Sequence, residues 1–251
     1  MQQKNNTQWM QRTRLLLGDE GMDKLQKAHV LIVGLGGVGS YAAEAICRAG
    51  VGEMTIVDGD VVDPTNRNRQ LQALATTHGM SKAKLMEERL LAINPYVKLN
   101  VIAEFQTPEM IVELLQQPFD YVVDAIDSIS PKIHLIKTAL EKGRKIVSSM
   151  GAGGKLDPTQ LKVVDISKTQ NCPMAYYVRK RLRYEGISTG VKAVFSMEMP
   201  NRNSIMLTDG TNFKKSAFGT ISYIPAAFGL TCASVVVRDL MELLPLSEEK
   251  S

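Results

Sequence analysis

A glycine-rich turn has the clearest chemical meaning in this sequence. Residues 29–40 read HVLIVGLGGVGS, a short apolar run that ends in glycines spaced GxGGxG and precedes a helix-like segment. Glycines lack the Cβ atom that would keep a phosphate away from the backbone, and the first N–H groups of a following helix point at the same place. The turn therefore predicts a nucleotide-binding site whose glycines are Gly34, Gly36, Gly37 and Gly39.

Charged and amide side chains follow the turn, near the ends of the next expected strands. Asp58 closes the run MTIVD, a little beyond the ~20 residues at which a ribose-binding carboxylate is expected. The loop GDVVDPTNRNRQ and Lys82 supply cations and amides for phosphates, and Asp127 follows a later strand, where a carboxylate can hold magnesium. A nicotinamide-binding unit does not need charged and amide residues in this loop, so the set favours a triphosphate as the ligand. The candidate nucleotide contacts are Asp58, Asp60, Asn66, Arg69, Gln70, Lys82 and Asp127, whereas Arg67 alone is expected to be a solvated loop charge.

These residues meet only if a particular fold brings their loops to one edge. Short apolar runs alternate with helical segments over the first half of the chain, which is typical of a Rossmann-like, doubly wound α/β fold. The expected strands are 30–33, 54–58, 98–103, 121–125 and 145–149, and the expected helices are 5–17 (stopping at Gly18), 81–93, 108–116 and 132–142. Strands at 161–166 and 191–199 come without matching crossover helices, so the sheet is predicted parallel in the first half and mixed in the second.

Length and composition favour one intracellular domain. The chain has 251 residues, 44% of them apolar, and we expect a single domain over 1–251, with a nucleotide-binding half (1–150) and a substrate-facing half (151–251). Three scattered cysteines argue against a disulfide framework and against a four-cysteine zinc site. The start, MQQKNNTQWMQR, has no apolar core of a signal peptide, so we expect a cytoplasmic location. A net charge of +4 permits contact with nucleic acid without demanding it.

One segment raises the question of a membrane. Residues 216–237 carry no charge and are about long enough to cross a bilayer. Pro225, two glycines and five Ser or Thr residues dilute the hydrophobicity of the segment, and its pattern is that of a strand running into a buried helix. A core helix is therefore favoured, with membrane association as the weaker alternative.

The motifs together resemble the adenylating enzymes related to ubiquitin activation, which include the molybdopterin- and thiamine-biosynthesis adenylyltransferases. The resemblance rests on GLGGVG, Asp58, the string TNRNRQ, which is similar to the family's SNLQRQ, Lys82, and the pair Asp124 and Asp127. It implies ATP and magnesium as cofactors and a homodimer. It assigns Asp58 to the ribose, Asn66, Arg69 and Lys82 to the phosphates, and Asp127 to magnesium. Arg12, with Arg14 as the alternative, resembles an arginine that reaches into the partner's ATP site, so the implied catalytic residues are Arg12, Arg69, Lys82 and Asp127.

Four strings resemble one branch of that family. They read RLLLGDEGMDKL, GVGSYAAEAICRAGVGEMTIVDGD, VVDAIDSISPK and GAGGKLDPTQLKVVDISKT. The branch uses ATP to adenylate the carboxylate of threonylcarbamoyladenosine beside the anticodon of tRNA, and then closes the substituent into a ring. Two alternatives stay open: an activator of a ubiquitin-like or sulfur-carrier protein C-terminus, and a nucleotide-sensing module or scaffold for a sulfur-transfer partner.

The region around Cys172 has two interpretations. The residue lies in KTQNCPMAYY, where related activators have a thioester cysteine, but a loop thiol is the simpler interpretation. The segment after it either grips RNA through cations and stacking rings or forms a solvated helix face. Its members are Arg179, Lys180, Arg181, Arg183, Tyr176, Tyr177 and Tyr184.

Overall fold

A seven-stranded sheet forms the centre of the molecule in the computed structural model, which describes residues 8–207 and 216–242. The strand order is β3-β2-β1-β4-β5-β7-β6, and every neighbouring pair is parallel except β6 with β7. The predicted doubly wound, later mixed sheet is confirmed. The strands are β1 (His29–Val33), β2 (Glu53–Val57), β3 (Lys98–Ile102), β4 (Tyr121–Asp124), β5 (Lys145–Ser149), β6 (Leu161–Asp165) and β7 (Lys192–Ser196).

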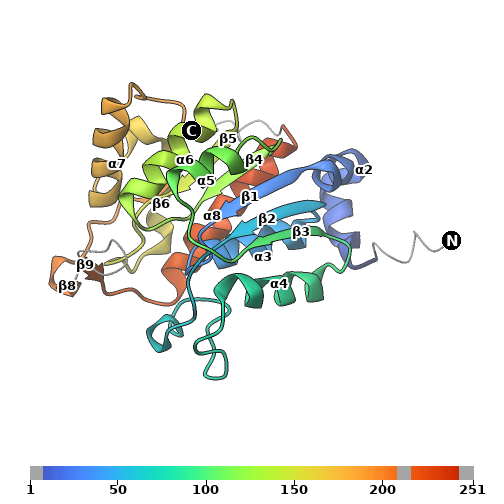
Figure 1. The fold of residues 1–251 in the computed structure, drawn as a ribbon, viewed down its shortest axis with the longest axis horizontal. Helices are drawn as coiled ribbons and strands as arrows, with labels where there is room; N and C mark the ends of the chain where they lie inside the picture. The colour runs from blue at the N-terminus through green and yellow to red at the C-terminus, as the bar shows by residue number, and fades with distance from the viewer. Residues whose placement is uncertain (1–7, 208–215, 243–251) are drawn as a thin grey trace, which may run out of the picture.

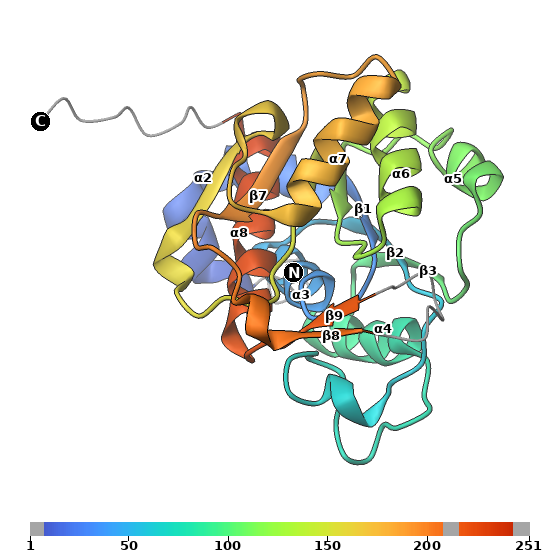
Figure 2. The same cartoon turned by 90° about the vertical axis from the view of Figure 1, so that its left-hand side faces the viewer.

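Helices cover both faces of the sheet (Figures 1 and 2). Side chains alternate along β1: Val30 and Ile32 join one hydrophobic cluster, while Leu31 and Val33 join the other. Because both faces are covered, the strand is apolar throughout, as parallel strands usually are. One face carries α3 (Gly39–Ala49), α4 (Lys82–Ile93) and α8 (Tyr223–Leu240), and the other carries α5 (Pro108–Leu114), α6 (Ile129–Glu141) and α7 (Pro173–Tyr184).

The prediction that the strands of the second half lack matching crossover helices was wrong. β7 runs parallel to β5, and the chain between them includes α7, which lies on the α6 face and completes a crossover. The inward stripe of α7 is only Ala175, Val178 and Leu182, placed among arginines and tyrosines, which is why its helical period is weak in the sequence. β6 lies antiparallel to β7 at the sheet edge, as a mixed sheet requires.

The chain before the sheet is a broken helix. α2 (Gln11–Lys27) is interrupted at Gly18, whose φ of 70° and ψ of 176° are not helical, so the predicted stop at this glycine is confirmed. A short 3-10 turn, Gln8–Met10, precedes α2, and the predicted helical residues before 8 lie outside the described chain. Because α2 leads into the start of β1, it lies at the edge of the sheet where the parallel strands begin (Figure 1).

The uncharged segment of the sequence forms a strand and a core helix. β9 (Ser216–Phe218) pairs antiparallel with β8 (Ile205–Leu207), and α8 follows. Within the described residues, α8 is the one helix long and apolar enough to span a bilayer, with a mean hydropathy of 1.3 over 18 residues. It packs along α3 and against β5, and buries Phe228, Cys232 and Val236. This packing is that of the predicted core helix.

Candidate active site

The glycine turn connects β1 to α3 at the carboxyl edge of the sheet. Gly34 has a φ of +91°, and a Cβ there would lie 2.8 Å from the carbonyl oxygen of Ala125. A Cβ at Gly39 would overlap the carbonyl oxygen of Gly34. At Gly36, by contrast, the nearest atom to a Cβ would be Nε2 of Gln70 at 3.8 Å. The turn is thus closed toward the protein and open at Gly36, as a backbone cradle for phosphate requires.

Asp58 connects the end of β2 to the glycine turn. Its carboxylate accepts hydrogen bonds from the backbone N–H groups of Leu35 (2.6 Å) and Asp60 (2.8 Å). Burial raises the pKa of Asp58, and the charge of Lys82 and these two N–H groups oppose that rise. The carboxylate therefore fixes the shape of the turn, and its contact with a ribose stays a prediction.

Lys82 and Asp60 form an ion pair beside Asp58. The Nζ of Lys82 donates to Oδ2 of Asp60 over 2.8 Å, and the lysine is almost fully buried at the first residue of α4. Ser81 caps this helix through its side chain, as the sequence predicts. Asp60 thus holds the lysine in position, and its predicted contact with a nucleotide has not been tested.

Arg69 packs against the glycine turn from the other side. A Cβ at Gly37 would lie 3.3 Å from the Cγ of Arg69, and Nη1 of the arginine donates to the carbonyl oxygen of Thr65 at 3.0 Å and to Oδ1 of Asn68 at 2.8 Å. Burial lowers the pKa of Arg69, and the charge of Asp127 opposes this. A cation and a carboxylate from separate strand ends therefore lie close together at the turn.

Amide side chains line the same loop. Oδ1 of Asn66 accepts from the backbone N–H of Asp63 at 3.2 Å, which closes a capping box on the turn Pro64–Asn66. Oε1 of Gln70 and Oε1 of Gln72 are buried without a hydrogen-bond partner in the described protein. Gln72 also donates to the carbonyl oxygen of Leu35 at 2.7 Å. Gln72 was not among the predicted site residues, although it stands two residues after Gln70.

A buried ion pair supports the loop that carries Asp127. Nζ of Lys132 donates to Oδ2 of Asp124 over 2.6 Å and to the carbonyl oxygen of Ser149 over 3.0 Å, and both charged side chains are fully buried. Oδ1 of Asp124 accepts from the backbone N–H of Ile126 at 3.1 Å. Asp124 and Asp127 were part of the predicted motif, but Lys132 was not, although it stands in the string SISPK.

Arg12 lies away from this site. It is exposed on α2, at the edge where the strands begin, whereas the glycine turn is at the edge where they end. Arg14, the alternative, forms an ion pair with Asp19 on the same helix. The structure therefore does not bring Arg12 to the glycine turn of its own chain.

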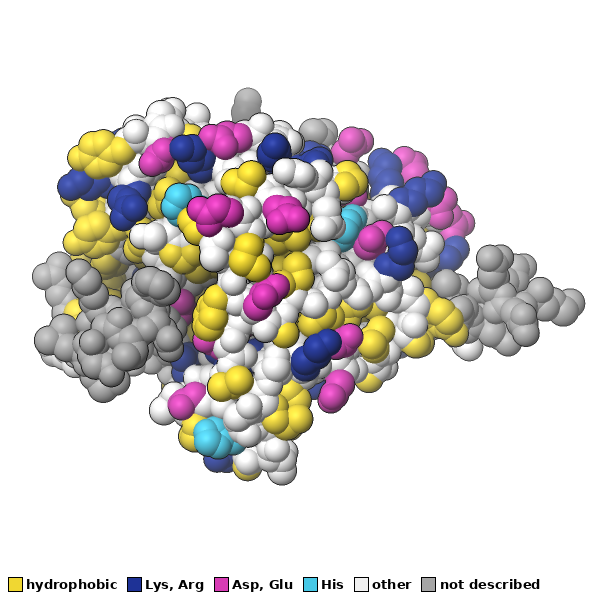
Figure 3. Space-filling view, viewed as in Figure 1, with side chains coloured by type: hydrophobic (Ala, Val, Ile, Leu, Met, Phe, Trp, Pro, Cys, Tyr) yellow, Lys and Arg dark blue, Asp and Glu magenta, His cyan; other side chains and the backbone are white. Residues whose placement is uncertain are grey.

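The residues around Cys172 divide into buried and exposed groups. Cys172 precedes α7 and is only 5% exposed. Arg179 is half-buried and donates to the carbonyl oxygen of Thr169 at 2.8 Å, so it is not part of a solvated face. Figure 3 shows basic and apolar side chains intermingled over α7. The exposed members are Lys180, Arg181, Arg183, Tyr176, Tyr177 and Tyr184.

The arrangement suits charge-rich phosphate chemistry. The open glycine cradle lies at a helix N-terminus, between β1 and β4, where the strand order of the sheet reverses. Open α/β sheets usually bind their ligands at this position. Two cations, Lys82 and Arg69, border it, with the Asp127 carboxylate near the arginine. Such a set can neutralise a triphosphate and stabilise charge that develops on the α-phosphate.

Known proteins share both the sequence and the fold of this chain. The model of the ThiF family matches residues 10–248. A tRNA threonylcarbamoyladenosine dehydratase of Bacillus subtilis is 40% identical over 246 residues, which cover 95% of this chain and 97% of that protein. Crystal structures of the Escherichia coli dehydratase TcdA, one in complex with ATP and one with AMP, superpose with a TM-score of 0.86 at 36% identity, covering 94% of this chain and 95% of theirs.

Proposed function

The chain belongs to the ThiF family, and from this premise we propose that it uses ATP to dehydrate threonylcarbamoyladenosine in tRNA. The observation that carries the proposal is the open glycine cradle with Lys82 and Arg69 beside it. Relatives that match over nearly their whole length are named for this activity on tRNA, and TcdA binds ATP and AMP in the same fold.

The reaction needs an activated carboxylate. Hydroxide is a poor leaving group, so the substrate carboxylate first attacks the α-phosphorus of ATP, forming an acyl adenylate and releasing pyrophosphate. A nucleophilic atom of the same modification then attacks the carbonyl carbon, AMP leaves with the former carboxylate oxygen, and the nucleophile loses its proton. Both reacting groups belong to one substituent, which supplies a high effective concentration, and no enzyme cysteine is needed.

Each site residue receives a role from its position. The turn of Gly34, Gly36, Gly37 and Gly39 would hold the phosphates, with Lys82 and Arg69 stabilising charge as pyrophosphate departs. Asp58 would accept from the ribose hydroxyls, and Asp60 would keep Lys82 oriented. The buried acceptor of Gln70 supports a contact with a ligand donor, and Asn66 shapes the loop between them.

A magnesium ion fits one carboxylate at this place. Among the described residues no group of three or more His, Cys, Asp or Glu side chains could hold a metal by itself. Magnesium commonly binds through one or two carboxylates, substrate phosphates and water, so Asp127 beside the cradle is a sufficient protein ligand. The ion, when bound between phosphates, would neutralise their charge.

We further propose a homodimer that completes each site. α2 exposes Leu15 and Leu16 to 81% and 83%, an apolar surface that pairing of two chains would cover. Arg12 lies on this helix, far from the glycine turn of its own chain, so a symmetric partner is the natural recipient of its charge. A reciprocal contact would supply one arginine to each site.

The carrier-protein alternative has less support. Proteins that act on sulfur carriers match a smaller part of the chain, such as 52% for a Thermus thermophilus adenylyltransferase. The proposed dehydration also needs no enzyme cysteine, so Cys172 requires no thioester role. A tRNA substrate supports the proposed cytoplasmic location, and a sulfur-transfer partner stays a prediction.

A labelled substrate tests the proposed reaction. Purified protein, ATP and tRNA carrying threonylcarbamoyladenosine should yield the cyclic nucleoside, AMP and pyrophosphate in equal amounts. With heavy oxygen in the substrate carboxylate, one labelled oxygen should appear in AMP, as mass spectrometry would show. Release of ADP and phosphate, or unlabelled AMP, would contradict adenylation.

A further inference from the structure

A pocket beside the N-terminus of α7 has no role in the proposed phosphate chemistry. Its volume is about 290 Å³, near the lower limit of the roughly 300–1,000 Å³ typical of small-ligand sites. Such a space suits a single ring system better than a whole nucleoside triphosphate. Its lining residues are Asn171, Cys172, Pro173, Tyr176, Arg179, Met199, Pro200, Ile205 and Phe218.

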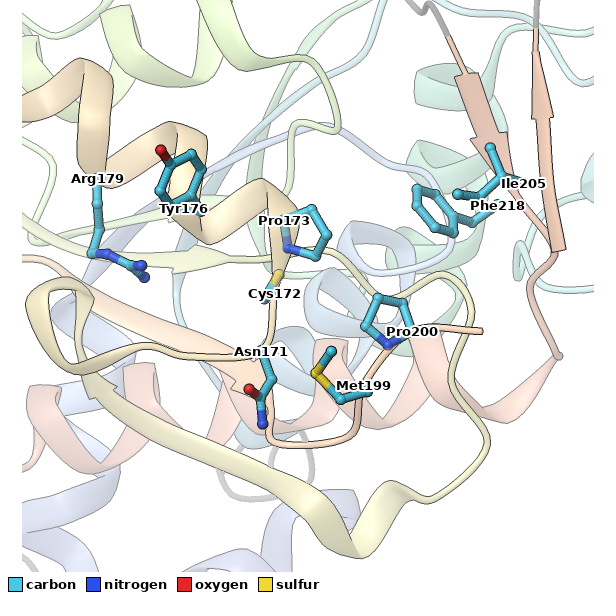
Figure 4. A pocket seen from close by; sticks show the side chains of 9 residues that line it. All are labelled: Asn171, Cys172, Pro173, Tyr176, Arg179, Met199, Pro200, Ile205 and Phe218. Atoms are coloured by element: carbon cyan, nitrogen blue, oxygen red, sulfur yellow. The ribbon is translucent and has the colours of Figure 1, made fainter. Parts of the chain in front are cut away.

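The two walls of the pocket come from distant parts of the chain (Figure 4). Tyr176 and Arg179 lie side by side on α7, and Phe218 lies opposite on the β8–β9 hairpin, with Pro200 between. The guanidinium of Arg179 is tied to the carbonyl oxygen of Thr169 at 2.8 Å, so its plane is held in position. Aromatic rings and ordered guanidinium planes are the surfaces on which unpaired RNA bases stack.

Polar groups at the rim suit RNA as well. Asn171 has a positive φ of 54° and donates from Nδ2 to the carbonyl oxygen of Met197 at 2.9 Å, which orients its amide. The amide oxygen can accept from an amino group on a base edge. Lys180 and Arg183 are exposed on the same helix, where they can contact the phosphates of a bound strand.

The pocket lies on the same edge of the sheet as the glycine turn. The chain after β7 leads to Met199 and Pro200, and β7 is three strand spacings from β1, about 14 Å by the usual strand separation. The carbonyl oxygen of Thr220, two residues beyond Phe218, accepts from Asn68 at 2.8 Å, so the hairpin wall is joined to the phosphate loop. A nucleotide near the reacting adenosine can therefore reach the pocket while the adenosine lies at the glycine turn.

We propose that this pocket receives one unpaired base of the anticodon loop, next to the nucleotide whose carboxylate is adenylated. The inference rests on the proposed function, because it takes tRNA as the substrate. The base stacks on Tyr176 beside Arg179 and is enclosed by Phe218 and Pro200. Its capture holds the loop so that the modified adenosine reaches the α-phosphate of ATP.

Substitution of Tyr176 tests the stacking. Tyr176→Ala should weaken binding of a tRNA anticodon stem-loop by about 5- to 100-fold, because one base–aromatic stacking contact contributes about this factor to the affinity. Tyr176→Phe keeps an aromatic ring and should bind with nearly wild-type affinity. Tyr177 is not a suitable control, because its ring packs edge-on against that of Tyr176, with 5.3 Å between the ring centroids. Tyr96→Ala is the control, since Tyr96 is similarly exposed (63% against 53%) but stands just before β3, at the edge of the sheet opposite the pocket. Fluorescence anisotropy measures all three. Equal losses for Tyr176→Ala and Tyr96→Ala, or none for either, would overturn the proposal.

Cys172 provides a second readout in the unmodified protein. It lines the pocket, whereas Cys47 and Cys232 are fully buried and burial raises their pKa values to about 11 and about 12. Iodoacetamide should therefore alkylate Cys172 first, the stem-loop should protect it, and an abasic nucleotide at one position beside the reacting adenosine should remove that protection. Protection by ATP alone, protection by every abasic loop, or no alkylation of Cys172 would each overturn the proposal.

The two proposals fail in different ways. If the wild-type protein does not cyclise the modified tRNA with ATP, the proposed function is contradicted. If the wild-type protein is active but Tyr176→Ala binds the stem-loop as tightly as Tyr96→Ala, only the base pocket is contradicted.

Discussion

Among the described residues, Lys82 and Arg69 are cations that lie beside the glycine turn, and their side chains are held by different contacts. Lys82 is buried and paired with Asp60 at 2.8 Å, whereas Arg69 bonds a carbonyl oxygen and an amide of its own loop. Loss of Lys82 also leaves Asp60 and the buried Asp58 without their nearby cation, so the stability of each variant has to be measured beside its rate.

We expect Lys82→Ala and Arg69→Ala each to lower kcat/KM for ATP-dependent cyclisation by roughly 10²–10³, because in the proposed mechanism each side chain stabilises charge that develops on the phosphates. Arg67→Ala is the matched control, since Arg67 is exposed in the same string and should leave the rate nearly unchanged. Pyrophosphate release measures the rate, and thermal unfolding checks the fold. Near-normal rates in both folded variants would refute the assigned roles.

The buried pair of Asp124 and Lys132 has a structural role at the residue scale. Lys132→Met should lower the free energy of unfolding by about 3–5 kcal/mol, because it leaves the Asp124 carboxylate buried without its cation. The double variant Asp124→Asn/Lys132→Met should recover part of that loss. Urea unfolding measures both, and a single variant as stable as wild type would contradict this assignment.

At the scale of elements, the glycine turn has two kinds of glycine. A Cβ at Gly39 would overlap the carbonyl oxygen of Gly34, but a Cβ at Gly36 would meet nothing closer than 3.8 Å. We therefore expect Gly39 to be needed for folding and Gly36 for the approach of a ligand.

Gly39→Ala should lower the Tm by several degrees, because the turn must open to admit the methyl group. Gly36→Ala should keep the wild-type Tm but bind ATP more weakly, since the methyl group enters the phosphate cradle. Calorimetry measures unfolding and binding in the same preparations. If Gly36→Ala bound ATP normally, the cradle would have to lie elsewhere on the turn.

The exposed face of α7 is the second element with a testable role. Lys180→Glu/Arg183→Glu should weaken tRNA binding and flatten its salt dependence, by a slope of about 0.7–0.9 per lost phosphate contact. Arg179 is left intact, because it bonds Thr169. Lys142→Glu/Lys145→Glu makes the same charge change where β5 begins, at the edge of the sheet opposite the glycine turn. This pair should leave the salt dependence of tRNA binding unchanged. Equal effects of both pairs would indicate net charge alone.

At the scale of the whole molecule, the separation of α2 from the glycine turn determines which nucleotide site Arg12 can reach. Arg12 and the exposed Leu15 and Leu16 lie on one helix at the edge where the strands begin. A symmetric pair of chains would cover the leucines and deliver an arginine to each partner.

Mixing Arg12→Ala chains with Lys82→Ala chains should restore up to about half of wild-type activity per heterodimer, because one of its two sites then has both residues. Subunit exchange is followed with distinct affinity tags, and each variant alone serves as the control. Absence of rescue despite exchange would mean that Arg12 acts within its own chain or has no catalytic role.

Local patterns in the sequence predicted most of the elements. The β5 strand has the predicted limits, Ser81 caps α4, and Gly18 breaks the first helix. These features depend on residues a few positions apart, through side-chain alternation, capping and the freedom of glycine. The glycine turn and the loop acids were evident for the same reason, and with them the family resemblance.

Contacts between distant segments were decided by the tertiary structure. Lys132 meets Asp124, Lys82 meets Asp60, and Arg12 is separated from its own glycine turn because strand order and helix direction set these distances. The pocket joins residues 171–179 to residues 199–205 and Phe218, which only the crossover through α7 and the β8–β9 pair bring together. Spacing along the chain carries no information on such pairs, because their separation depends on how the sheet is assembled.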